Sequence, residues 1–152
     1  MSIRPATLSD LGRILDLGEQ LHKESPRWSR LSFNRAKAAE FLAQLILGPA
    51  GVVFVAEKDG LVVGGIAGMA AAHWSSDDIV AQEVSFFMAP GARGNMVAAR
   101  LVCALQAWGD IKGAKWLQAG TSTGLDPERT AGLYERLGFS RCAIGLEVTY
   151  GH

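Results

Sequence analysis

Apolar residues near the amino end of the chain recur with the period of a helix. Thr7 and Asp10 have the spacing of a capping box, and leucine and isoleucine then return every three or four positions. This pattern predicts a helix over residues 9–22, after a short strand over residues 3–6. A polar stretch that contains a proline interrupts the pattern, and a second helix is expected over residues 32–47, where Gly-Pro ends it.

The middle of the chain changes from a helical period to strand patterns. Residues 52–56 form an unbroken apolar run, and Asp59-Gly60 is a strong signal for a two-residue hairpin turn. The turn leads into a second apolar run over residues 61–67, so two antiparallel strands are expected. A further strand is predicted over residues 79–88, after a loop over residues 72–78.

The second half of the chain alternates between helix and strand. A helix with one apolar stripe is predicted from Gly94 onward. A short strand over residues 115–119 comes before Asp126-Pro127, a favourable helix start, and Gly138 is a usual helix terminator. Residues 139–150 are expected to form a closing pair of strands. The order of elements therefore predicts a mixed α/β layer sandwich.

Composition narrows the class of protein and partner. The 152 residues suit one domain over residues 1–152, with a single buried core. Fifteen Lys and Arg residues balance fifteen Asp and Glu residues, so no overall field would attract nucleic acid or an anionic membrane. We therefore expect a small partner. The amino terminus lacks the apolar core of a signal peptide, and a cytoplasmic location is expected.

The two cysteines give no sign of a cross-link or a metal. Cys103 and Cys142 lie far apart, without CxxC spacing and without a neighbouring histidine cluster. We expect both thiols to be reduced and packed, and we expect no bound metal.

The most informative chemistry lies where the apolar strand ending at Met88 runs through a glycine-bearing turn into a helix. The first N–H groups of a helix have no acceptor within it, and the helix dipole adds positive charge there. Gly91 and Gly94 allow a close approach to the main chain, and Arg93 adds a cation. The pattern predicts a phosphate-binding turn.

Two motifs, together with the element order, resemble the GNAT superfamily of N-acetyltransferases. The superfamily's pyrophosphate loop, written Q/R-x-x-G-x-G/A, falls on residues 91–96, where Arg93-Gly94 stands as expected. Gly91 replaces the leading polar residue of that loop, and Met96 replaces its last small residue. The stronger match is RTAGLYERLGF at residues 129–139, which is similar to the family's "lYekLGF" helix.

The resemblance covers nearly the whole chain and implies both a fold and a co-substrate. The implied fold is a mixed, mostly antiparallel central sheet of six to seven strands flanked by about four helices. The implied co-substrate is acetyl-CoA, with an amine as the acceptor and no metal. Without the resemblance, R-G-x-x-x-A reads equally well as a plain helix start that contains a glycine.

The family's coenzyme contacts carry over onto the strand end and the turn. Main-chain groups of Met88 and Ala89 would meet the pantetheine arm and the acyl carbonyl. Asp126 is close to the position of an asparagine that touches the coenzyme in the family, although a helix-capping role is the stronger reading. The main-chain amides expected to hold the pyrophosphate are those of Arg93, Gly94, Asn95, Met96, Val97 and Ala98.

The resemblance also suggests an acid and a base. Tyr134 stands where many family members place a tyrosine beside the coenzyme sulfur, so we expect it to protonate the departing thiolate. The alternative is a core tyrosine with a purely structural hydroxyl. Glu83 is the candidate base or water anchor, since partial burial would raise its pKa, and the alternative is a solvent-facing strand residue. His73 is a second candidate base.

Aromatic residues suggest the acceptor side but leave its identity open. Trp28, Phe33 and Trp74, together with His73, fall in loop regions that line the acceptor groove in the family. They would suit a small-molecule or peptide amine. A non-catalytic acyl-CoA-binding or regulatory module remains an alternative, as does an unrelated α/β protein. Relatives often pair, so a homodimer is also possible.

Overall fold

The computed structural model describes residues 1–93 and 96–152. The helices are α1 (Leu11–Glu24), α2 (Arg35–Leu47), α3 (Met96–Ile111) and α4 (Pro127–Arg136). The strands are β1 (Ser2–Pro5), β2 (Gly51–Lys58), β3 (Leu61–Ala72), β4 (Ile79–Met88) and β5 (Leu117–Gln118). Three single 3-10 turns are η1 (Leu8–Asp10), η2 (Trp28–Arg30) and η3 (Pro90–Ala92).

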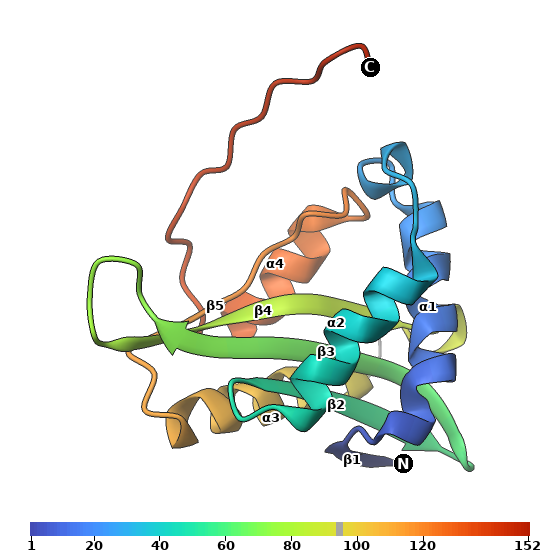
Figure 1. The fold of residues 1–152 in the computed structure, drawn as a ribbon, viewed down its shortest axis with the longest axis horizontal. Coiled ribbons are helices and arrows are strands. Elements are labelled where there is room, and N and C mark those ends of the chain that lie inside the picture. The colour runs from blue at the N-terminus through green and yellow to red at the C-terminus, as the bar shows by residue number, and fades with distance from the viewer. Residues whose placement is uncertain (94–95) are drawn as a thin grey trace.

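The strands form one sheet in the order β1-β2-β3-β4-β5. The first three pairs are antiparallel, and β4 pairs with β5 in parallel. Helices α1 and α2 cover one face of the sheet, and α3 covers the other (Figure 1). This arrangement confirms the mixed, mostly antiparallel α/β fold with four helices.

Each face of the sheet has its own core because successive strand residues point to opposite sides. Val53 and Val55 of β2 lie in the core under α1 and α2, while Ala56 belongs to the core under α3 and α4. Gly68 of β3 is required where α3 approaches closely. A Cβ added to Gly68 would lie 2.5 Å from Cδ1 of Leu105, which is 1% exposed.

Several local predictions are confirmed in detail. Thr7 and Asp10 form a capping box, in which the Thr7 amide donates to the Asp10 carboxylate over 2.8 Å. The box begins η1, which runs directly into α1. Asp59 and Gly60 both have positive φ angles, 52° and 78°, as the tight hairpin turn between β2 and β3 requires. Gly138 ends α4 with a φ of 100°.

The predicted closing strands are wrong for the described structure. No strand follows α4 in the described residues, so the sheet has five strands instead of six to seven. Residues 139–150 do carry a strand-like alternation, but a strand needs a neighbouring ladder, and this segment runs away from the sheet (Figure 1). Cys103 and Cys142 are free thiols, and both are exposed instead of packed.

The described helices give no candidate for a membrane span, since none is long and apolar enough to cross a bilayer.

Candidate active site

The site begins where two neighbouring strands separate. In the part of the chain that the structure describes, β4 and β5 pair at Ala81 with Leu117 and at Gln82 with Gln118. Beyond Gln82, β4 continues to Met88, whereas the chain after Gln118 turns into a loop over residues 119–126. The parallel pair therefore opens into a gap within the sheet.

A β-bulge shapes β4 at the same point. Ala67 pairs with Ser85 and Gly68 pairs with Glu83, so Val84 is an extra residue in β4. Bulges redirect the side chains beside them and are common next to functional sites. The bulge thus places an unpaired residue, Val84, directly after Glu83.

A cavity of about 460 Å³ fills the gap. Its walls come from β4, from the loop after β5, from α4 and from the end of α1. The lining residues that bear on the chemistry are Trp28, Glu83, Met88, Arg93, Ala98, Gly120, Asp126, Arg129 and Arg136. Apolar walls with a few convergent polar groups are typical of a small-molecule site.

Glu83 is a partly buried carboxylate in the wall of this cavity. Burial raises the pKa of Glu83 from 4.5 to about 7, because desolvation penalises its charged form. A hydrogen bond from the main chain of Gly120 opposes this shift without cancelling it. Glu83 can therefore exchange a proton near neutral pH, which a general base requires.

Tyr134 of α4 holds a buried phenol close enough to feel the charge of Glu83. Burial, and next the negative charge of Glu83, raise the pKa of Tyr134 above its usual range. The ring packs against Phe139 at 5.0 Å and Phe86 at 6.3 Å between centroids. Among the described residues, the Tyr134 hydroxyl has no hydrogen-bond partner. A buried hydroxyl without a partner is costly, so it points to a group that arrives with a ligand.

Three arginines give the cavity a cationic side. Nη2 of Arg93 lies 2.8 Å from Oε2 of Glu24, and its Nε donates to the main-chain oxygen of Met88 over 3.3 Å. Within the described structure, Arg129 and Arg136 of α4 form no ion pair, and both line the cavity. These cations fit an anionic ligand such as a phosphate.

The predicted coenzyme residues are partly brought together. Ala98, in the first turn of α3, is buried and lines the cavity. The amide of Ala89 is already donated to Val63 over 2.8 Å. Gly94 and Asn95 lie outside the described residues. Asp126 lines the cavity and also accepts from the Arg129 amide as the cap of α4, so the capping interpretation is confirmed.

The predicted acceptor residues separate into two groups. Trp28 lines the cavity. Phe33 lies outside the lining, against the ring of His22 at 5.3 Å. His73 and Trp74 sit in the turn between β3 and β4, also outside the lining. The Nδ1 of His73 lies 2.9 Å from Oγ of Ser75, and Trp74 is 91% exposed. Their loop follows the end of β3, and the acceptor-binding role that the resemblance implies for them stays a prediction.

The sequence analysis missed one residue that holds two walls of the cavity together. Ser25 is completely buried at the end of α1, and its hydroxyl donates to the main-chain oxygen of Thr123. Arg27 adds a bond of 2.9 Å to the main-chain oxygen of Ser122. The two bonds fasten the segment with Trp28 to the loop that carries Gly120. The sequence signals only a helix end at Ser25-Pro26, so no pattern could have found this link.

The described residues contain no group of three or more His, Cys, Asp or Glu side chains placed to hold a metal ion.

Comparisons with known proteins agree with this geometry. A family model described as an acetyltransferase (GNAT) domain matches residues 49–141. The aminoglycoside antibiotic 6'-N-acetyltransferase AAC(6')-IG from Acinetobacter haemolyticus has a similar structure, with a TM-score of 0.76 and 17% identity over 100% of this chain and 99% of that chain.

Two further solved structures share the fold. The ribosomal-protein-alanine N-acetyltransferase from Brucella melitensis biovar Abortus 2308 has a TM-score of 0.72 and 17% identity, covering 99% of each chain. A transcriptional regulator from Bacillus halodurans C-125 has a TM-score of 0.76 and 19% identity, covering 98% of this chain and 99% of that chain. No curated protein sequence matches significantly. At these identities the structural likeness shows the fold alone.

Proposed function

Because the chain belongs to the GNAT acetyltransferase family, we propose that it moves an acetyl group from acetyl-CoA to a primary amine by direct attack in a ternary complex. The observation that carries this proposal is the closeness of a partly buried carboxylate, Glu83, which lines the cavity, to a buried phenol, Tyr134 of α4, whose pKa responds to the charge of Glu83. One group is suited to accept a proton, and the other is suited to donate one.

The cationic side of the cavity supports binding of the coenzyme. Arg93 precedes α3, whose amino end adds the partial positive charge of a helix dipole. Arg129 and Arg136 add two further charges from α4. The diphosphate would lie along this side, and Arg93 would exchange part of its contact with Glu24 for the phosphate. The main chain near Met88 would then face the pantetheine arm.

Glu83 and Tyr134 divide the proton transfers between them. The amine nitrogen attacks the acetyl carbonyl, the new C–N bond forms and the C–S bond breaks. Glu83 takes the proton that the amine loses, directly or through a water molecule, because its pKa lies near 7. Tyr134 supplies a proton to the departing sulfur. Burial and the negative charge of Glu83 both raise the pKa of Tyr134 and so make its phenol a weaker acid, but the second effect disappears once Glu83 has taken the proton of the amine.

The acceptor would enter past Trp28, at the end of the cavity formed by α1 and the loop after β5. This entrance combines an aromatic wall with the Glu83 carboxylate, which would attract a cationic amine. A small-molecule amine and a peptide amine both fit this description, and aminoglycoside and protein acetyltransferases are both among the proteins with this fold.

A second candidate is a non-catalytic module that binds acyl-CoA. It is favoured by the departures from the family loop at Gly91 and Met96, and by the ion pair that occupies Arg93. The two candidates share the binding step and differ in turnover.

Calorimetric titration with acetyl-CoA, followed by an amine panel monitored by release of free thiol, tests the proposal. We expect binding together with acceptor-dependent thiol release. Binding without any thiol release above background hydrolysis would favour the module, and no binding at millimolar coenzyme would refute both candidates.

A further inference from the structure

The last turn of α1 places a carboxylate at the rim of the active-site cavity. Glu24 is the final residue of the helix, and Leu21, three positions before it, lines the cavity. Residues three positions apart share a helix face, so Glu24 lies on the cavity side of α1. Trp28, just after the helix, also lines the cavity. Glu24 therefore lies at the entrance through which the acceptor would pass.

A cation that precedes α3 holds this carboxylate. Nη2 of Arg93 lies 2.8 Å from Oε2 of Glu24, and Oε1 of Glu24 accepts from the side-chain amide of Gln20 over 3.1 Å. The carboxyl end of a helix carries partial negative charge, so a carboxylate there is unfavourable without a cation beside it. In the part of the chain that the structure describes, Arg93 is that cation.

The proposed coenzyme would draw Arg93 away from Glu24. Nε of Arg93 donates to the main-chain oxygen of Met88 over 3.3 Å, and Arg93 is part of the cavity lining. A diphosphate offers this guanidinium more charge and more acceptor oxygens than one carboxylate does. Binding of the coenzyme would therefore leave the charge of Glu24 less compensated than before.

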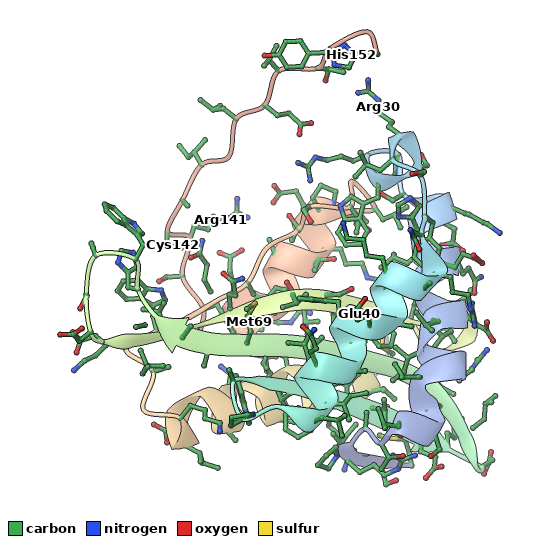
Figure 2. The ribbon with its side chains drawn as sticks, in the orientation of Figure 1. Arg30, Glu40, Met69, Arg141, Cys142 and His152 are labelled. Carbon is green, nitrogen blue, oxygen red and sulfur yellow. The ribbon has the colours of Figure 1, made fainter. Side chains whose placement is uncertain are left out.

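The neighbouring cations have partners of their own. Nη2 of Arg27 lies 2.7 Å from Oε2 of Glu147. Arg30 extends from η2 toward the carboxy-terminal residues, where it donates to the Thr149 hydroxyl over 3.3 Å (Figure 2). Lys23 pairs over 3.9 Å with a glutamate one turn earlier in α1. These engagements leave an arriving acceptor as the source of a cation that replaces Arg93.

We propose that Glu24 binds a second ammonium group of the acceptor, and that the preferred acceptor is therefore a small molecule with at least two amino groups. This inference rests on the proposed acetyl transfer and names its substrate class. The amine that reacts must become neutral, and Glu83 serves that step by taking the proton. The second ammonium group keeps its proton, and a carboxylate at the rim is suited to hold it. Trp28 adds an aromatic face at the same entrance, which also favours a cation.

Matched pairs of amines measure this preference. Butylamine is compared with tetramethylenediamine, and hexylamine with hexamethylenediamine, by thiol release from acetyl-CoA. For the native chain we expect kcat/KM to be roughly fivefold higher for the diamine than for the monoamine of the same length. Glu24→Gln should abolish this preference. Glu19→Gln is the matched control and should keep it, because Glu19 lies on the same helix, pairs with Lys23 and has a side chain 33% exposed, against 32% for Glu24.

Calorimetry separates this inference from the proposed reaction. Hexamethylenediamine is titrated into the native chain with and without saturating CoA. We expect tighter binding in the presence of CoA, because the coenzyme has then drawn Arg93 away from Glu24, and we expect Glu24→Gln to lose the difference. Absence of thiol release with every amine would refute the reaction, and this titration would still test the role of Glu24.

Three outcomes would overturn the assignment of Glu24. The first is an equal kcat/KM for monoamines and diamines with the native chain. The second is an equal affinity of the native chain for the diamine with and without CoA. The third is a diamine preference that Glu24→Gln leaves intact while circular dichroism shows an unchanged fold.

Discussion

Ser25 and Thr123 are 98 positions apart in the sequence, yet the hydroxyl of one donates to the main-chain oxygen of the other. The same hydroxyl accepts the amide hydrogen of Trp28 over 2.8 Å. One buried side chain therefore joins the end of α1, the aromatic wall of the cavity and the loop after β5. Arg27, which donates to the main-chain oxygen of Ser122 over 2.9 Å, adds a second link between the same segments.

Ser25→Ala should loosen both sides of this link. It leaves the Trp28 amide and the Thr123 oxygen without the buried hydroxyl, at a cost of about 1–3 kcal/mol in the free energy of unfolding. We also expect a higher KM for the acceptor. Thermal unfolding and steady-state kinetics measure the two effects. Ser29→Ala, at an exposed position of the same segment, is the control and should change neither.

Glu83 should control the pH dependence of the reaction. With a pKa of about 7, Glu83 is protonated below neutral pH and cannot act as a base there. The value of kcat/KM should therefore rise with pH through about 7. Glu83→Gln should lower kcat roughly a hundredfold and abolish that rise. A variant that keeps the native pH profile would remove Glu83 from the role of base.

Glu83 should also make the stability of the fold depend on pH. Stability should fall as the pH rises, whereas activity should rise. The pKa of Glu83 is higher in the folded chain, about 7, than its usual value of 4.5, so the folded state binds more protons between these two values. The free energy of unfolding attributable to Glu83 should fall by up to about 3 kcal/mol as the pH rises through this window. Chemical denaturation at pH 5 and at pH 8 measures this change. Between these pH values, the free energy of unfolding should decrease less for Glu83→Gln than for the native chain.

Tyr134→Phe distinguishes a catalyst from a binding module. The hydroxyl makes no hydrogen bond within the described structure, so its removal should leave the fold as stable as before or slightly more stable. We expect kcat to fall roughly a hundredfold while the affinity for acetyl-CoA, measured by calorimetry, is unchanged. If Tyr134→Phe and the native chain had equal kcat values, another group would have to protonate the thiolate.

Two glycines should respond to alanine in opposite ways. Gly68→Ala forces a Cβ against Leu105 between sheet and helix, and should destabilise the fold by about 1–3 kcal/mol. Gly18→Ala lies in α1 with nothing within 4 Å of the new Cβ, and should stabilise it by about 0.5–1 kcal/mol. Denaturant midpoints measure both. If Gly68→Ala did not destabilise the fold, α3 would have to move away from the sheet to make room for the new Cβ.

The sequence by itself determined the elements whose causes are local. The apolar period predicted α1 because side chains three and four positions apart share a helix face. The Asp59-Gly60 turn was predictable because both residues tolerate positive φ angles.

Only the tertiary structure decided which of these features meet. The burial of Glu83 depends on where β4 and β5 separate, and the placing of His73 and Trp74 outside the cavity depends on how far β3 extends. Residues 139–150 have a strand-like sequence without a ladder in the described structure, because a strand is completed by a neighbour that its own residues cannot specify. Hydrogen bonds across long sequence separations, such as the one from Ser25 to Thr123, carry no local pattern.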